Sequence, residues 1–171
     1  FTDPEIKRTN LAAVVLQMRA FKLGNPRTFP FLEPPDPKAI RDAERLLEEL
    51  GATDAQGLTQ VGRVMARLPV DPRLARMLVA ANEHRSLNEV LVIASALTIA
   101  DPRDRPMEKQ GSADRAHEQW VDERSDFIAL LNIWRWHESA RQELTRNRLR
   151  RELVKRFLSV ARMREWRELH R

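Results

Sequence analysis

The residues best suited to chemistry in this sequence are the arginines of its C-terminal segment. Residues 141–171 contain 11 Lys and Arg against 4 Glu, whereas the 140 residues before them carry 19 cationic and 21 acidic side chains. Arginine supplies 25 of the 30 cations, and its planar guanidinium binds phosphate through paired hydrogen bonds and stacks on bases. This bias favours a polyanionic partner such as nucleic acid. A high-GC coding sequence or a surface rich in ion pairs would produce the same bias.

A continuous helix is predicted over about Gln142 to Leu169, with its basic residues on one side. At 100° per residue, five cations fall within an arc of about 80°: Arg141, Arg148, Arg151, Lys155 and Arg162. Trp166 is predicted on the same face, and an arginine stripe with an interleaved indole can hold phosphates and stack a base. The alternative is a solvated face on which Trp166 packs against another domain.

The sequence lacks the residues that most catalytic and metal-binding sites require. There is no cysteine, which excludes thiolate metal sites, disulfides and cysteine nucleophiles. The five glycines form neither a dinucleotide-binding loop nor a Walker A loop. His117-Glu118 and His137-Glu138 begin like a zinc-protease motif, but no second histidine follows at ligand spacing. We therefore predict no metal site and no catalytic constellation, and we expect the isolated histidines to be exposed or partly packed.

The chain predicts a mainly α protein of one domain or two small ones. Helical periodicity covers residues 5–21, 38–50, 59–68, 73–84 and 87–99 and resumes from about residue 114, after a proline-containing loop at 101–111. Asp36-Pro37 and Asp71-Pro72 each place an N-cap carboxylate before a proline suited to the first helical turn. Gly51 to Leu58 is expected to form a small hairpin. The elements predicted over residues 5–68 follow the order helix, helix, hairpin, helix, which is typical of a winged helix.

Two further features bear on location and completeness. The longest apolar run, Leu11 to Leu16, is far shorter than the roughly 20 residues of a membrane span. The sequence begins at Phe1 and ends on Arg171 inside a helical pattern. We therefore expect a fragment of a longer protein that does not enter a membrane.

Several short motifs, spread over nearly the whole chain, occur together in one known family. They are Pro4-Glu5-Ile6 through Leu11, Phe31-Leu32-Glu33-Pro34-Pro35, Leu50-Gly51-Ala52, Gly62-Arg63, Met65-Ala66, Leu68 to Pro72, Arg105-Pro106 and Ser125-Asp126-Phe127 with Leu130-Leu131-Asn132. Their combination resembles the region behind the second RecA domain of DEAH-box (DEAH/RHA) RNA helicases. Phe157-Leu158 with Arg162 to Trp166 resembles the bacterial HrpA-type branch.

The resemblance implies a winged-helix domain with a small β-hairpin over residues 1–70 and a helical-bundle domain, called HA2 or ratchet-like, over residues 71–171. It implies a parent that is an ATP-dependent RNA helicase and NTP hydrolase of the cytoplasm. ATP and Mg²⁺ would bind in RecA domains outside this chain, which itself would hold no cofactor. The implied partners are single-stranded RNA and the RecA-like and OB-fold domains of the same parent.

The resemblance also implies a mechanical role, in which these accessory domains close one side of an RNA channel and catalyse nothing alone. RecA-domain movement would step the RNA while the bundle holds it. By motif match we expect RNA contacts from Arg103, Arg105, Arg124, Ser125 and Asp126, in addition to the basic stripe residues Arg148, Arg151, Lys155 and Arg162. For Arg105 an ion pair that pins the loop is an alternative, and for Asp126 a helix cap or an arginine partner. The family often has histidine where Phe127 stands, so no imidazole contact is expected there.

Two other functions remain open from the sequence. A stand-alone winged-helix regulator would need a basic recognition helix, but residues 59–68 offer only Gln60, Arg63 and Arg67. A purely structural interaction bundle would carry its arginines as a compositional bias. Salt-dependent RNA binding separates an RNA clamp from such a bundle.

Overall fold

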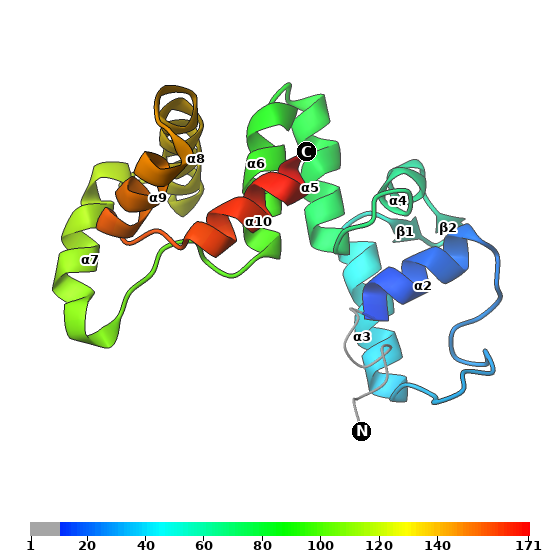
Figure 1. Cartoon of the computed structure of the whole chain (residues 1–171). Helices are drawn as coiled ribbons and strands as arrows, with labels where there is room; N and C mark the ends of the chain where they lie inside the picture. Colours follow the sequence, from blue (N-terminus) through cyan, green and yellow to red (C-terminus); the bar gives the residue numbers. More distant parts are fainter. Residues whose placement is uncertain (1–10) are drawn as a thin grey trace. The chain divides into compact units, whose positions relative to one another are not determined.

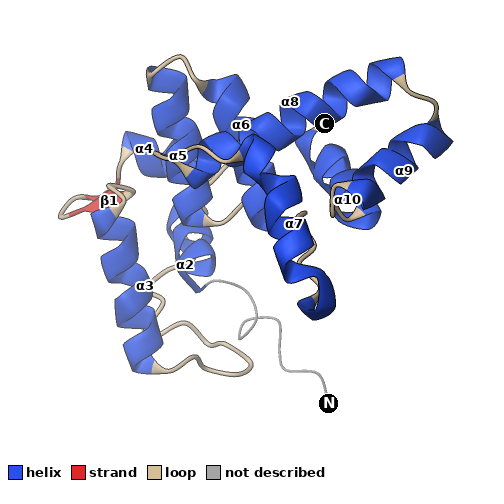
Figure 2. Ribbon diagram, turned by 90° about the vertical axis from the view of Figure 1, so that its left-hand side faces the viewer, coloured by secondary structure: helices blue, strands red, loops and turns tan. Residues whose placement is uncertain are grey.

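The computed structural model describes residues 11–171, and the chain divides into two compact units, Phe1–Arg85 and Ser86–Arg171 (Figure 1). Almost all regular structure is helical, and the strands of the described residues form one small hairpin (Figure 2). The fold is therefore mainly α, a winged-helix part followed by a helical bundle, as predicted. The division after Arg85 lies further along the chain than the domain boundary at residue 70, which stays a prediction.

The first unit contains helices α2 (Leu11–Ala20), α3 (Pro37–Glu49), α4 (Gln60–Met65) and α5 (Pro72–Glu83), and strands β1 (Thr53–Asp54) and β2 (Gly57–Leu58). The two Asp-Pro helix starts are confirmed. Asp36 accepts a hydrogen bond from the Lys38 N–H at 2.7 Å, and Asp71 accepts one from the Arg73 N–H at 2.8 Å. Of the first predicted helix, residues 5–10 lie outside the described residues.

The predicted hairpin is also confirmed, with Thr53 opposite Leu58 and Asp54 opposite Gly57. Gly57 has φ +114°, a backbone conformation that side chains disfavour. Helix α4 packs closely on this hairpin, because a Cβ on Gly62 would lie 2.1 Å from the Ala52 carbonyl oxygen. The glycine thus sets the distance between helix and hairpin in the winged-helix part.

The core of the first unit lies where α2 and α3 pack together with α4 and α5. Its buried residues are Ala12, Val15, Leu16, Ala43, Leu47, Ala52, Met65 and Ala75. Since the unit has its own buried apolar cluster, it meets the usual requirement for a compact folding unit.

The second unit contains helices α6 (Leu87–Thr98), α7 (Gln110–His117), α8 (Asp126–Glu143), α9 (Arg146–Lys155) and α10 (Val160–His170), and 3₁₀ turns at Met107–Lys109 (η1) and Glu118–Trp120 (η2). The prediction of one helix over 142–169 is wrong, because the chain breaks after Glu143 and again after Lys155. The predicted loop ends earlier than residue 111, and a break at 118–125 separates α7 from α8.

A second apolar cluster explains the breaks in the C-terminal segment. It contains Val92, Ala96, Trp120, Leu130, Ile133, Leu153, Leu158, Met163 and Trp166. Leu153 on α9 and Trp166 on α10 both reach this cluster because the chain turns at Phe157, whose φ is +53°. A straight helix would carry those two side chains away from a common core.

Candidate nucleic-acid interface

The proline-containing loop, which the family resemblance predicts to face RNA, is held against the turn between α9 and α10. The Asp104 N–H donates to the Phe157 carbonyl at 2.8 Å, and the Ser159 N–H donates to the Pro102 carbonyl at 2.9 Å. Arg103 and Leu158 form an isolated antiparallel bridge between these hydrogen bonds. We call this pairing of residues 102–104 with 157–159 the backbone clip.

Arg103 is a half-buried member of the loop, paired with a carboxylate. Its Nη2 lies 2.7 Å from Asp101 Oδ2, and its Nε 3.0 Å from Asp101 Oδ1. Burial raises the pKa of Asp101, but the hydrogen bonds and charge of Arg103 outweigh it and leave that pKa lowered. The hydrogen bond to Asp101 raises the pKa of Arg103 against burial, and the charge of Asp126 adds to the rise. Arg103 and Asp126 therefore lie close enough in the structure for their opposite charges to interact.

Arg105 and Arg162 are also engaged with carboxylates. Arg105 Nη2 lies 2.6 Å from Asp114 Oδ1 on α7, the ion pair that the sequence left open as an alternative. Arg162 Nη1 donates to the Asp101 carbonyl at 2.8 Å and lies 3.0 Å from Asp104 Oδ1. Arg162 therefore ties α10 to the loop at the backbone clip.

The start of α8 presents the next group of predicted contacts. Arg124 is 86% exposed, with its Nε 3.9 Å from Asp122 Oδ1. Ser125 is the N-cap residue, whose side chain makes no capping hydrogen bond but whose carbonyl accepts from the Ile128 N–H at 3.1 Å. Asp126 is exposed in the first turn of α8, where a carboxylate stabilises the positive helix end. The N-cap of α8 is therefore Ser125 and not Asp126, while the charge of Asp126 acts on Arg103, as the arginine-partner alternative expects.

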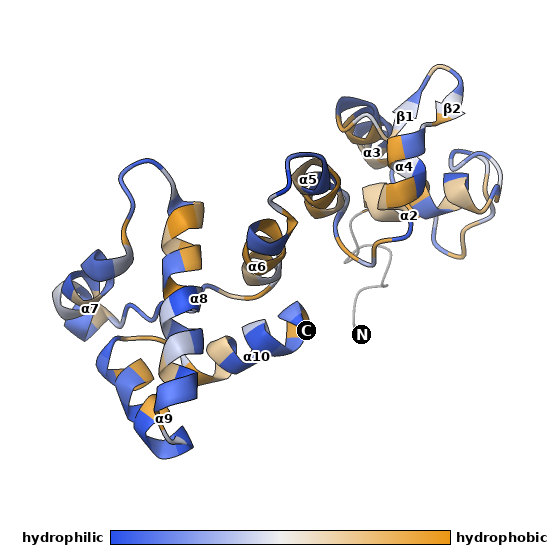
Figure 3. Cartoon of the chain, turned by 90° about the horizontal axis from the view of Figure 1, so that it is seen from above, coloured by the Kyte–Doolittle hydropathy of each residue, from blue (hydrophilic) through white to orange (hydrophobic). Residues whose placement is uncertain are grey.

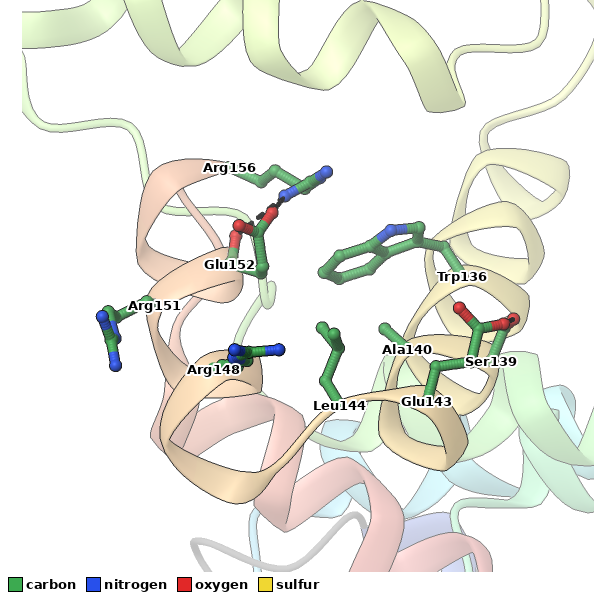
Figure 4. A pocket seen from close by; sticks show the side chains of 9 residues that line it. All are labelled: Trp136, Ser139, Ala140, Glu143, Leu144, Arg148, Arg151, Glu152 and Arg156. Atoms are coloured by element: carbon green, nitrogen blue, oxygen red, sulfur yellow. Dashed lines mark hydrogen bonds and ion pairs between the residues drawn. The ribbon is translucent and has the colours of Figure 1, made fainter.

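Helix α9 carries three of the predicted stripe residues. Arg148 and Arg151 line a hollow of about 480 Å³ between α8 and α9, together with Trp136 (Figure 4). Figure 4 shows Arg148 pointing toward α8, whereas Arg151 projects from the side of α9 away from Trp136. Arg156 lies 4.8 Å over the Trp136 ring and pairs with Glu152. Lys155 is exposed one turn beyond Arg151.

The single basic stripe predicted for the C-terminal segment is wrong as a helical face. Arg141 lies on α8, Arg148, Arg151 and Lys155 on α9, and Arg162 on α10. Trp166, expected on the basic face, is fully buried and its Nε1–H donates to the Val92 carbonyl at 3.0 Å. The indole is thus a core residue and offers no surface to a base.

The expectation of exposed or partly packed histidines is wrong for two of the four. His117 is buried with Nε2 3.1 Å from the Phe157 carbonyl oxygen, a contact beside the backbone clip. His137 is buried on α8, and its Nδ1 makes no hydrogen bond although it lies 3.3 Å from Glu138 Oε1. Burial lowers the pKa of His137 against the opposing charge of Glu138.

Sequence reasoning missed a second set of arginines on α9 and α10. Arg146 and Arg150 line hollows shared with Arg164 and Arg167. The spacing of Arg146 and Arg150, one turn apart, was visible in the sequence. Their meeting with α10 was not, because it requires the break between the two helices.

Two kinds of feature are absent from the described part of the chain. Within 11–171, no group of three or more His, Asp or Glu side chains is arranged to hold a metal ion. None of the described helices combines the length and the apolar character needed to cross a bilayer.

Two family models match adjoining parts of the chain, and they meet at residues 70 and 71, before the division between the two compact units after Arg85. Residues 43–70 match the helicase associated domain HA2, winged-helix, and residues 71–130 match the helicase associated domain HA2, ratchet-like. The chain is 47% identical over 178 residues to the ATP-dependent RNA helicase HrpA homolog of Haemophilus influenzae and 48% identical over 176 residues to the ATP-dependent RNA helicase HrpA of Escherichia coli. It is 34% identical over 145 residues to the "Probable ATP-dependent RNA helicase DHX34" of Homo sapiens.

These similarities show to which family the chain belongs. The chain belongs to the helicase-associated HA2 family of DEAH-box proteins, with its winged-helix and ratchet-like parts in sequence. It is an HA2 region of the HrpA type, because 99% of the chain is covered by each of the two HrpA relatives. It spans 14% of the length of each of those relatives, and 13% of the length of the human one.

Proposed function

We propose that this chain is an accessory region of an ATP-dependent DEAH-box RNA helicase, which helps to form the single-stranded RNA channel. In this proposal it couples RecA-domain movement to RNA translocation and unwinding and catalyses no step alone. ATP and Mg²⁺ bind in the RecA domains of the parent, an OB-fold domain completes the channel, and the protein works in the cytoplasm. Two relatives are named as ATP-dependent RNA helicases, and the similarity of this chain to them supports the proposal.

The observation that carries the RNA contact is the supply of unpaired cations on the second unit. Arg148, Arg151 and Lys155 are exposed, and none has a carboxylate of the described residues within ion-pair distance. Arg124 adds a fourth exposed cation at the start of α8. Such side chains bind phosphates without first breaking a strong internal pair.

The remaining predicted contacts take a different part in this proposal. Arg103, Arg105 and Arg162 are paired with carboxylates, so they fix the loop that precedes α7. Ser125 and Asp126 then set where α8 begins and how Arg124 is presented. Direct contact of these five residues with RNA remains part of the proposal.

The test is fluorescence anisotropy of a short single-stranded RNA with this chain over a salt series. The variant Arg148→Ala/Arg151→Ala/Lys155→Ala should bind more weakly. The slope of log K against log salt should become shallower by about 0.7 for each phosphate that the variant no longer binds. Arg124→Ala alone should give about one third of that change in slope, since it removes one cation where the triple variant removes three. Equal binding by the triple variant and the unmodified chain would contradict the proposed contact.

A charge-matched control separates local contact from net charge. Lys38, Arg41 and Arg73 are exposed on α3 and α5 of the first unit. Lys38→Ala/Arg41→Ala/Arg73→Ala removes the same charge and should leave the affinity near that of the unmodified chain. A decrease in affinity as large as that of the α9 variant would show that only overall charge matters.

The structure favours no second function. Helix α4 has six residues, and Arg63 Nη1 on it donates to the Leu58 carbonyl at 2.9 Å. This helix therefore lacks the row of free basic side chains that a winged-helix reader inserts into a groove.

A further inference from the structure

Helices α8, α9 and α10 enclose a basic groove that the proposed function does not use. Two adjoining hollows of about 380 and 430 Å³ share four lining residues, Arg146, Leu149, Arg164 and Arg167. Together the hollows are lined by six guanidinium groups: Arg141, Arg146, Arg150, Arg164, Arg167 and Arg171. We call the two hollows with these six side chains the arginine groove.

The carboxylates near the arginine groove neutralise only half of its cations. Glu138 lies 3.0 Å from Arg141 Nη2 and 3.6 Å from Arg167 Nε, and Glu168 lies 2.9 Å from Arg164 Nε. In the described part of the chain no carboxylate pairs with Arg146, Arg150 or Arg171. The groove therefore holds an excess of positive charge and lacks an internal partner for it.

The guanidinium groups of the arginine groove are arranged in rows along α9 and α10. Arg146 and Arg150 lie four residues apart on α9, about 6 Å along its axis, and Arg167 and Arg171 have the same spacing at the end of α10. Like charges at this spacing destabilise a helix unless counter-charge lies between them. A row of anionic groups along the groove would supply that counter-charge, whereas a single small anion would reach only one pair.

The floor of the arginine groove is apolar, with one buried polar group. Leu149, Leu153, Val160 and Met163 line the hollow between α9 and α10, and His137 closes it from α8. His137 Nδ1 is buried there without a hydrogen bond. Leu153 and Met163 are buried members of the apolar cluster and Leu149 and Val160 pack against it, whereas most other residues along α9 and α10 are hydrophilic (Figure 3). An apolar floor between guanidinium rows suits a ligand whose anionic groups alternate with flat or apolar ones.

We propose that the arginine groove binds the phosphate backbone of a single-stranded nucleic acid, with riboses and bases over its apolar floor. Guanidinium groups match phosphate through two parallel hydrogen bonds, and several of them in rows favour a chain of phosphates. Arg146 and Arg150 point about opposite to Arg148, Arg151 and Lys155 around α9. The groove is thus a second contact on the other face of the same helix, and this inference rests on the proposed RNA-binding function.

The test compares the two faces of α9 in the same chain. Arg146→Ala/Arg150→Ala should weaken binding of a single-stranded RNA and reduce its salt slope by about 1.4, from about 0.7 for each phosphate contact. Arg148→Ala/Arg151→Ala probes the other face with the same change of charge, and Lys38→Ala/Arg41→Ala serves as the unaffected control. All six side chains are exposed, so circular dichroism should show unchanged helix content.

The outcomes separate the inference from the proposed function. If Arg146→Ala/Arg150→Ala binds RNA as the unmodified chain does, while Arg148→Ala/Arg151→Ala binds less, the arginine groove is excluded and the proposed function stands. If the unmodified chain binds no RNA even at low salt, both are overturned. If a polyglutamate peptide binds in the groove and RNA does not, the groove is a protein-docking site and the inference is wrong.

Discussion

His137 is a buried imidazole whose neighbours are a carboxylate and two guanidinium groups. Burial lowers its pKa below the ordinary value of 6.5, and Glu138 opposes this while Arg167 and Arg141 add to it. The folded chain thus keeps His137 neutral at a pH where the unfolded chain protonates it. Between the lowered pKa and 6.5 the unfolded state binds more protons, so stability falls as pH falls through this window.

His137→Gln should therefore flatten the pH dependence of stability. We expect the Tm of the unmodified chain to fall between about pH 7 and pH 5, and the fall to be smaller in the variant. The exposed histidine His84 provides the control, since His84→Gln should keep the dependence of the unmodified chain. Parallel Tm curves for His137→Gln and the unmodified chain would show that His137 does not titrate with unfolding.

At the scale of single residues, helical periodicity in the sequence identified which positions are apolar, but not what each of those side chains packs against. Trp134 follows Phe127 and Leu131 at helical spacing, and it packs against the core with 5.0 Å between its ring centroid and that of Trp166. Trp166 itself was placed on the wrong face, because its direction was calculated for an unbroken helix. The buried histidines were missed for a related reason, since an isolated histidine carries no local signal of burial.

At the scale of elements, the backbone clip decides the shape of the C-terminal segment. Residues 157–159 pair with 102–104, and this pairing takes the chain out of helical geometry between α9 and α10. Arg162 adds a side-chain connection between α10 and the loop. The same backbone pairing therefore accounts for the break between α9 and α10 and for the position of the proline-containing loop.

Arg162→Ala should loosen the clip. Removing its hydrogen bond to the Asp101 carbonyl and its ion pair with Asp104 should cost about 1 kcal/mol. For a unit of this size that corresponds to a fall in Tm of about 4–8 °C, measurable by calorimetry. Arg164→Ala on the same helix removes only an exposed pair with Glu168 and should shift the Tm less. If Arg162→Ala melts like the unmodified chain but binds RNA poorly, Arg162 is an RNA contact and not a structural one.

The elements that the sequence predicted correctly have local signals, and those it missed do not. Asp36 and Asp71 cap helices by their own chemistry, and Gly57 supplies the turn of the hairpin. Residues 156–159 contain neither glycine nor proline, and the local signal is confined to Ser159, whose hydroxyl caps α10 by accepting from the Arg162 N–H at 3.4 Å. Pairing with a loop far earlier in the chain imposes the break, and single-sequence periodicity does not contain that contact.

At the scale of the whole molecule, each unit has its own apolar cluster, and the basic side chains concentrate in residues 141–171 of the second. The family and the mainly α fold followed from motifs along the sequence, since these depend on residue types at fixed spacing. The groove that Arg146 and Arg150 share with Arg164 and Arg167 did not follow, because it depends on how α8, α9 and α10 pack. The central claim is that RNA contacts this second unit.

The most direct measurement is photo-cross-linking of a thiouridine-substituted single-stranded RNA to this chain, followed by mass spectrometry of the peptides. The account predicts cross-links within residues 101–171, at the start of α8 and on both faces of α9, and none within residues 11–85. Cross-links centred on residues 53–65, the hairpin and α4, would contradict it and would indicate a winged helix that reads nucleic acid itself.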